Sequence, residues 1–149
     1  MDCRVWLEFA CLLINEETTM HLPRIQTTLY ANALFSSFCG LFMLLDSGWW
    51  SAEVLDVPEV VFIVLGAGLL LFALDVLLLA RAVPPSILRL KIIFAADLAW
   101  VAATPILLLL YADYFSSLGV WLTVDVAVIV AMFAMLEWLG IKRRNALSP

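Results

Sequence analysis

The stretch Lys91–Tyr111, KIIFAADLAWVAATPILLLLY, decides the fold. It has the length of a membrane-crossing helix, because about 20 mostly apolar residues are needed to cross the hydrocarbon layer. A carboxylate, Asp97, lies inside this apolar run. Pro105 lacks a backbone N–H and removes the hydrogen bond to the carbonyl of Val101, so we expect a kink there. The stretch therefore predicts a kinked membrane helix that contains a buried acid.

The composition of the whole chain agrees with this interpretation. The 149 residues are 65% hydrophobic and carry a formal net charge of −5, and their mean hydropathy is +1.06. Soluble domains are typically only about 45–50% apolar. The sequence predicts a single all-α membrane domain built as a bundle of four transmembrane helices. The lipid bilayer is its expected surrounding partner, and no nucleic-acid partner is expected.

Charge placement predicts how the helices cross the membrane. The predicted spans are about 25–45, 60–80, 90–111 and 117–140, within a domain 25–144 that is followed by a tail, 145–149. The segment between the first two spans, Asp46–Pro58, contains acids and no Lys or Arg, whereas all eight basic residues fall on the other predicted side. Basic residues favour the cytoplasmic side. We therefore expect both termini in the cytoplasm and Trp49 and Trp50 as outer interfacial anchors.

Residues 1–24 have two interpretations. Helical spacing of Arg4, Glu8, Leu12 and Asn15 predicts a short, weakly amphipathic interfacial helix. Alternatively, the native start is Met20 and the preceding residues are a non-native extension. Either way, the apolar part of this segment is too short to cross a membrane.

The sequence contains no recognisable catalytic or cofactor-binding constellation. Cys3, Cys11 and Cys39 lack the paired spacing of redox sites, and the lone His21 has no companion ligands. No nucleophile–base pair or phosphate-binding loop is present. We therefore expect no metal, no cofactor and no enzymatic activity.

Polar side chains define inward faces on the predicted helices. Thr28, Asn32, Ser36 and Cys39 share one face of the first span, and buried hydroxyl and amide groups need protein partners in lipid. Gly68 and Asp75 share a face of the second span, whereas Gly66 points the opposite way. Close approach of a neighbouring helix backbone is expected at such glycines.

The third and fourth spans each present two distinct faces. In the third span Asp97, Trp100 and Thr104 share a face, and a face of alanines, suited to close helix contact, lies opposite at Ala95, Ala99 and Ala102. One broad face of the fourth span carries Gly119, Thr123, Ala127, Ala134 and Glu137, and Asp125 points away from it. Gly140 is predicted to cap this helix.

Seven residues form the candidate site for protons or a ligand: Asn32, Asp75, Asp97, Trp100, Thr104, Asp125 and Glu137. By depth, a polar column is expected, with Asn32, Asp75 and Asp97 at one level and Ser36, Thr104 and Asp125 further out. A central Asp costs roughly 2.5–3.5 kcal/mol to insert, whereas a membrane hydrogen bond returns about 0.6 kcal/mol on average, which moves weight towards a function, more for Asp97 and Asp125 than for Asp75 and Glu137 near the interface. A structural role, with the carboxyl groups hydrogen-bonded between helices, is the interpretation that it competes with. Trp100 either lines a pocket or packs with its N–H bonded to Asp97.

Three segments carry a resemblance: LGAGLLLFALDVLLLAR at 65–81, AADLAWVAATPILLLL at 95–110 and GVWLTVDVAVIVAMFAMLEWLGIKRR at 119–144. They resemble a group of uncharacterised small four-helix integral membrane proteins of bacteria, from about Leu22 to Arg144. The resemblance implies the four-helix topology and an inner-membrane location. Small multidrug transporters have a similar size but carry an acid in their first helix, where this chain has Asn32.

Several functions remain open on the sequence alone. The leading interpretation is a helix-packing interaction or accessory protein that contacts copies of itself or a larger membrane complex. The alternatives are a proton-coupled carrier or proton pathway that uses Asp97 and Asp125, and a bundle that binds an apolar ligand near Trp100. Convergence of Asp75, Asp97 and Asp125 on one cavity would favour transport or binding; dispersal would favour a structural role.

Overall fold

The structure, a computed structural model, describes residues 25–146. The predicted amphipathic helix, the alternative start at Met20 and His21 lie outside these residues, as do residues 147–149 of the predicted tail. Within residues 25–146, four helices are long and apolar enough to cross a membrane: Ile25–Leu45, Glu59–Arg81 (α3), Ile87–Leu110 (α4) and Ser117–Ala146 (α5). The prediction of an all-helical chain with four membrane-length helices is confirmed.

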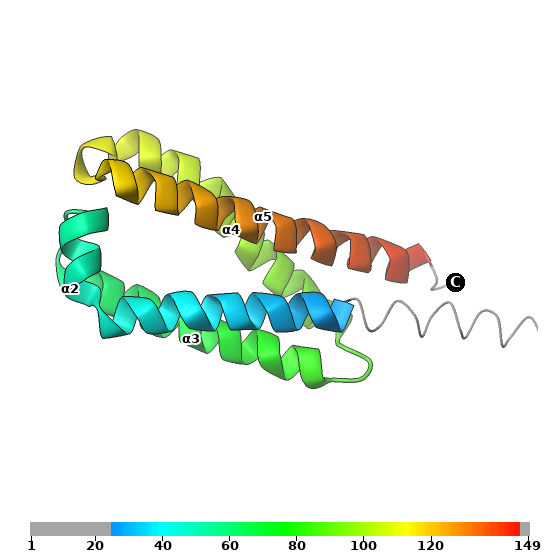
Figure 1. Cartoon of the computed structure of the whole chain (residues 1–149). Coiled ribbons are helices and arrows are strands. Elements are labelled where there is room, and N and C mark those ends of the chain that lie inside the picture. Colours follow the sequence, from blue (N-terminus) through cyan, green and yellow to red (C-terminus); the bar gives the residue numbers. More distant parts are fainter. Residues whose placement is uncertain (1–24, 147–149) are drawn as a thin grey trace, which may run out of the picture.

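The four helices form two antiparallel pairs (Figure 1). The helix Ile25–Leu45, called the first helix below, packs against α3, and α4 packs against α5. A Cβ atom on Gly40 would lie 2.8 Å from the carbonyl oxygen of Gly66, and one on Gly66 would lie 2.7 Å from that of Gly40. The two glycines therefore let the first helix and α3 touch through their backbones. At Gly68, by contrast, an added Cβ atom would have no described neighbour within 4 Å.

The segment predicted as an outer loop is largely helical. It contains α2 (Ser47–Trp49) and a π-helical turn, η1 (Trp50–Val54). The Trp50 ring packs against Phe42 and Phe62, with ring centroids 5.5 and 5.8 Å apart, and only 9% of Trp50 is exposed. The prediction of Trp50 as an interfacial anchor is therefore wrong, because its ring is part of an aromatic core at this end of the molecule.

Backbone contacts close the same end of the molecule across the two helix pairs. The amide of Asp56 donates to the carbonyl of Tyr114 at 2.9 Å, and that of Ser116 donates to Val54 at 3.2 Å. A Cβ atom on Gly119 would lie 1.9 Å from the Val54 carbonyl oxygen, so the approach of η1 to α5 requires glycine there. The connection between α4 and α5, which includes the short 3-10 helix η2 (Ala112–Tyr114), is thereby held against the first helix pair.

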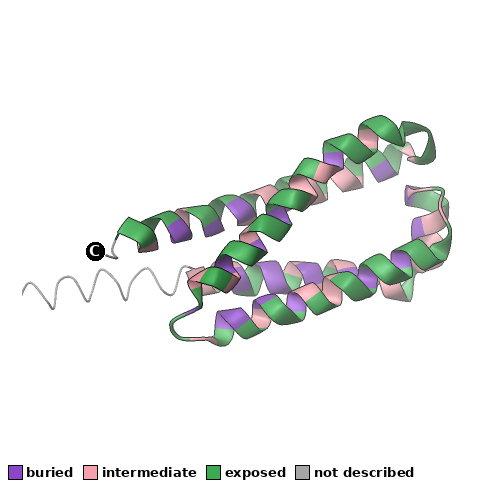
Figure 2. Ribbon diagram, turned by 180° about the vertical axis from the view of Figure 1, so that it is seen from behind, coloured by how far each residue is buried: buried purple, intermediate pink, exposed green. Residues whose placement is uncertain are grey.

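Buried residues follow the inward faces of the helices, and exposed residues cover the outward faces (Figure 2). The largest buried apolar cluster joins all four long helices: Leu29, Ala33, Val76, Leu79, Ala80, Leu90, Ile93 and Ile141. Many large apolar side chains are exposed, as expected where lipid rather than water surrounds a helix. Burial inside the protein is therefore confined to narrow stripes.

The helix α4 continues through Pro105 to Leu110, with the proline inside it. One expectation about a helix end is corrected. The helix α5 continues past Gly140 to Ala146, so Gly140 is not its cap. A Cβ atom on Gly140 would lie 2.9 Å from the side chain of Ile25. This glycine serves helix packing, and α5 includes Asn145 and Ala146.

Charges separate between the two ends of the described chain. Ile25 and the C-terminal end of α5 lie at the same end, together with the connection from α3 to α4 (Figure 1). The basic residues of the described chain are at this end: Arg81, Arg89, Lys91, Lys142, Arg143 and Arg144. The acids of the connecting segments, Asp46, Glu53, Asp56 and Asp113, are at the other end, together with Glu59 at the start of α3.

Candidate functional site

Three polar side chains meet between the first helix, α4 and α5. Asn32 Nδ2 donates to Asp97 Oδ2 at 2.7 Å and to Glu137 Oε1 at 3.2 Å. Asn32 and Glu137 are each 1% exposed, and Asp97 is 4% exposed. We call these three residues the carboxyl–amide cluster. One amide nitrogen thus holds two carboxyl groups in a buried position.

Ser36 sets the orientation of the Asn32 amide. Its hydroxyl, one helical turn away, donates to Asn32 Oδ1 at 3.2 Å. Because the amide oxygen accepts this bond, the amide nitrogen is turned towards the two carboxyl groups. Both residues are buried, which confirms the prediction that this face of the first helix points towards protein.

Glu137 has one oxygen without a partner. Its Oε2 is buried and makes no hydrogen bond with the described residues. Buried polar atoms are nearly always hydrogen-bonded, and leaving one unpaired costs about 1–3 kcal/mol. An acid retained at this cost inside a membrane-length helix marks the cluster as a candidate functional site.

Asp75 lies apart from the cluster. It is on the outward side of α3 and forms an ion pair with Arg89 near the start of α4, with side chains 50% and 39% exposed respectively. The predicted contact of Asp75 with Asn32 and Asp97 is therefore wrong. Depth along the helix was used for that prediction, whereas the helix face decides which neighbours a side chain meets.

The outer half of the predicted polar column does not form either. Asp125 is exposed on α5. Thr104 is buried, but its hydroxyl donates to the carbonyl of Trp100 in its own helix at 3.0 Å. Twelve residues separate Asp125 from Glu137, which corresponds to about 120° around a helix. The two acids of α5 therefore point in different directions, and only Glu137 joins Asp97.

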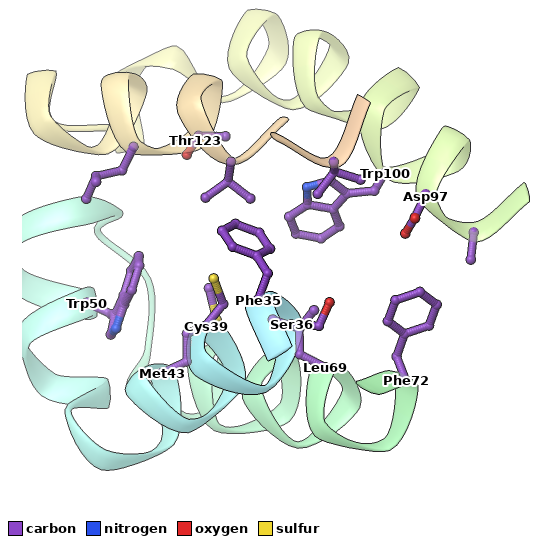
Figure 3. A pocket seen from close by; sticks show the side chains of 14 residues that line it. Phe35, Ser36, Cys39, Met43, Trp50, Leu69, Phe72, Asp97, Trp100 and Thr123 are labelled. Carbon is purple, nitrogen blue, oxygen red and sulfur yellow. The ribbon is translucent and has the colours of Figure 1, made fainter. Parts of the chain in front are cut away.

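A cavity of about 270 Å³ lies between the two helix pairs, beside the carboxyl–amide cluster. Leu69 of α3 and Val126 and Val130 of α5 contribute aliphatic walls. Figure 3 shows its aromatic side chains, which come from the first helix, η1, α3 and α4: Phe35, Trp50, Phe72 and Trp100. The cavity is thus mainly apolar and aromatic, with few polar groups in its wall.

Asp97 belongs to both the cluster and the cavity wall. Its carboxyl group points from α4 into the space opposite Ser36 and Phe72 (Figure 3). Asn32 occupies Oδ2, and no hydrogen bond from a described residue reaches the other oxygen, Oδ1. A molecule in the cavity would therefore meet a carboxyl group at one end.

Trp100 combines parts of its two predicted roles. Its ring lines the cavity, as the pocket interpretation predicted. Its indole nitrogen is buried without a hydrogen-bond partner among the described residues. The predicted bond from this N–H to Asp97 is therefore absent.

Other cavity residues were not identified from the sequence. Phe35 and Phe72 are common apolar residues in apolar segments and gave no distinguishing signal, whereas Trp50 was predicted as an interfacial anchor. Cys39 had a signal, because it follows Ser36 on the polar face of the first helix. Glu137, by contrast, is a predicted site residue outside the cavity wall; it shares a face with Gly119 and Ala134, and all three are buried.

Within the described residues, no three His, Cys, Asp or Glu side chains gather closely enough to hold a metal ion. Comparison of the chain with known protein families, with curated proteins and with solved structures finds no match in any of the three. The class of the protein therefore rests on its own features, an all-helical chain with four helices long and apolar enough to cross a membrane.

Proposed function

We propose that the chain is a multi-pass protein of the bacterial inner membrane that binds a small, mainly apolar molecule in the cavity between its two helix pairs. The observation that carries this proposal is an apolar cavity of about 270 Å³ with a buried carboxyl group in its wall. Small-molecule sites are typically concave, mostly apolar and equipped with a few polar groups that orient the ligand. The cavity between the helix pairs has this composition.

Charge distribution supports the proposed orientation, with both termini in the cytoplasm. Basic residues cluster at the end that holds Ile25 and the end of α5, and acids cluster at the other end. Cytoplasmic ends of membrane proteins are enriched in Lys and Arg. The bacterial location rests on the sequence resemblance. A fluorescent protein fused after Pro149 should fluoresce in bacterial cells if the C-terminus is cytoplasmic, and a dark but exported fusion would contradict the orientation.

The volume of the cavity limits the size of the proposed ligand. An apolar protein cavity of about 150 Å³ accommodates benzene. By proportion, a cavity of about 270 Å³ accommodates about eleven non-hydrogen atoms. Neopentylbenzene, a neutral hydrocarbon, has that size and suits the apolar walls, so it is the probe for the proposed function.

Cys39 provides a direct measurement of occupancy, because its thiol is free and lines the cavity. In the full-length Cys3→Ser/Cys11→Ser protein, we expect bound neopentylbenzene to slow alkylation of Cys39 by N-ethylmaleimide, saturably and by about tenfold. The matched control moves the thiol to the outward face of the first helix through Leu34→Cys in a Cys39→Ser background, since Leu34 is 74% exposed. Equal slowing at both positions would mean partitioning into the membrane rather than binding.

A second variant fills the cavity. Val126 lines it from α5, so Val126→Phe should abolish protection of Cys39 by occupying the ligand's volume. Val128→Phe is the control, because Val128 is 56% exposed on the same helix. Protection that survives Val126→Phe unchanged would place the hydrocarbon outside the cavity and contradict the proposed function.

The second candidate function is that of an interaction or accessory protein, which would contact its own copies or a larger membrane complex. Its support is the alanine face of α4, since Ala95, Ala99 and Ala102 are all exposed in the single chain and small residues suit close helix contact. Ala99→Cys protein should form disulfide-linked dimers in the membrane under mild oxidation if two copies meet there. Asp75, Asp97 and Asp125 do not converge on one cavity, which favours a structural role for Asp75 and Asp125 and leaves the proposed binding to the cavity beside Asp97. A proton-coupled carrier that uses Asp97 and Asp125 has less support for the same reason, because Asp125 is on the outward side of α5.

A further inference from the structure

The carboxyl–amide cluster lacks a positively charged partner within the described chain. Its two carboxyl groups share the uncharged amide of Asn32. Three basic side chains at the same end of the molecule have contacts elsewhere. Arg89 forms an ion pair with Asp75, Arg144 donates a hydrogen bond to the carbonyl of Pro85, and Lys142 lies over the Trp138 ring. The cluster is thus an acidic site that a cation from outside the chain would complement.

The cavity beside the cluster has walls that suit a cation with an apolar body. Aromatic faces attract cations, by about 0.5–1 kcal/mol at exposed sites and more where water is excluded. The rings of Phe35, Phe72 and Trp100 line the cavity around Asp97, which points into the same space (Figure 3). Asp97 supplies one negative group, Oδ1 of which has no hydrogen bond from a described residue.

We propose that the ligand of this cavity is a lipophilic monocation, a protonated or quaternary amine with an apolar body of about ten atoms, which pairs with Asp97 in exchange for a proton. This inference rests on the proposed function, since it names the ligand class of the same cavity. The aromatic rings hold the apolar body, and the amine nitrogen lies at the end of the cavity next to Asp97. Glu137 lies behind Asp97 and is linked to it through Asn32.

The proton balance follows from competition for one carboxyl group. When that group is protonated, the arriving cation displaces the proton; the O–H bond breaks, its electron pair stays on the carboxylate and the proton leaves to water. When the group is already ionised, the cation binds without releasing a proton. Because the two positive species compete, affinity for the cation falls as pH falls, by up to about tenfold per pH unit.

The elements around the cavity contribute few other groups that titrate. The first helix contributes the Cys39 thiol, α4 contributes Asp97, and α5 contributes Glu137 behind it. The wall formed by α3 is apolar, and the acid of that helix, Asp75, is outside and paired with Arg89. The η1 turn contributes the Trp50 ring. The carboxyl groups of Asp97 and Glu137 are therefore the acids whose protonation the cation opposes.

A matched pair of probes isolates the positive charge. Benzyltrimethylammonium and neopentylbenzene have the same shape and differ in a single central atom, nitrogen or carbon, and so in charge. Each is added to the full-length Cys3→Ser/Cys11→Ser protein in lipid nanodiscs, and its dissociation constant is obtained from the slowing of Cys39 alkylation. Rates with and without probe are compared at each pH between about pH 5 and pH 8, so the titration of the thiol itself cancels.

We expect both probes to protect Cys39, with a dissociation constant that rises in acid for the cation and stays constant for the hydrocarbon. Asp97→Asn should raise the dissociation constant of the cation by about thirtyfold or more relative to any change for the hydrocarbon, because a buried charge pair is lost. The hydrocarbon result also reports that this variant folds. Asp75→Asn is the matched control and should leave the dissociation constants of both probes unchanged, since Asp75 is outside the cavity.

The outcomes separate the two proposals. Protection by neopentylbenzene without protection by benzyltrimethylammonium at the highest pH would overturn the cation proposal and leave the proposed function standing. Protection by neither probe would overturn both. A cation dissociation constant that is the same at every pH, or that Asp97→Asn does not change, would overturn pairing in exchange for a proton. If Asp97→Asn protein binds neither probe, the pH series on the Asp97 protein decides.

Discussion

Asp97 and Asp75 were expected at the same depth in the membrane, yet their surroundings differ in every respect. Asp97 is 4% exposed and accepts a hydrogen bond from the uncharged Asn32. The side chain of Asp75 is 50% exposed and pairs with Arg89. The first acid is enclosed by protein without a positive partner, and the second has a positive partner at the surface.

The comparison shows what distinguishes a candidate site from a structural charge. An exposed ion pair neutralises its own charge and contributes little, typically about 0–1 kcal/mol. A buried carboxyl group held only by an amide retains its need for a counterion or a proton. Only the second arrangement, with Glu137 behind it and a cavity in front, offers something for a ligand to satisfy.

The largest expected effect comes from removing the donor that the buried acids share. Asn32→Leu leaves the carboxyl groups of Asp97 and Glu137 without their hydrogen bonds, so we expect the free energy of unfolding to fall by about 2–3 kcal/mol. The measurement is denaturation of the purified protein in micelles, followed by circular dichroism. The triple variant Asn32→Leu/Asp97→Leu/Glu137→Leu should recover most of this loss, because no buried polar group remains. A triple variant less stable than Asn32→Leu would contradict the comparison.

The second prediction tests whether the outer end depends on backbone contact rather than on carboxyl groups. Gly119→Ala places a Cβ atom against the Val54 carbonyl. We expect the free energy of unfolding to fall by about 2 kcal/mol, because the backbone of η1 or α5 must move to make room. Gly68→Ala is the control in α3, where no described atom lies within 4 Å. The free energy of unfolding of the Gly68→Ala variant should rise by about 0.5–1 kcal/mol, because alanine has a higher helix propensity than glycine. Equal effects at the two glycines would mean that η1 does not press on α5.

The surface ion pair should contribute less than the cluster. Asp75→Asn removes the charge that pairs with Arg89, and we expect a change of no more than about 1 kcal/mol in the free energy of unfolding. The effect should shrink further when salt is raised, because exposed charges are screened. A loss as large as that of Asn32→Leu, or one independent of salt, would show that Asp75 is buried in the membrane-embedded protein.

Much of the fold was predictable from the sequence, because hydropathy and charge act on whole segments. Runs of about 20 apolar residues located the four helices, whose observed bounds are Ile25–Leu45, Glu59–Arg81, Ile87–Leu110 and Ser117–Ala146. The predictions that were wrong assigned a role to a single residue from its type and its place in the sequence. Gly140 was interpreted as a helix end although it packs against Ile25, and Trp50 was interpreted as an anchor although it is in an aromatic core.

The candidate site was predictable only in part. Helical spacing placed Asn32 and Ser36 on an inward face and separated Glu137 from Asp125, and the structure agrees on each point. The sequence did not show which faces of the helices contact each other, and two side chains at equal depth in two helices do not meet unless those faces do. Asp75 shows this, since its outward direction depends on how α3 rotates to bring Gly66 against Gly40.

The smallest effect is expected at Thr104, which shares the predicted face of Asp97 but not its contacts. Its hydroxyl donates to the carbonyl of Trp100 within α4, and a threonine that bonds back to its own helix contributes little to stability. Thr104→Val keeps the shape of the side chain and should change the free energy of unfolding by about 0.5 kcal/mol or less. Cation protection of Cys39 should also be unchanged. A large loss of protection would extend the site along α4 beyond Trp100, and the buried acids would then no longer differ from the rest of that face.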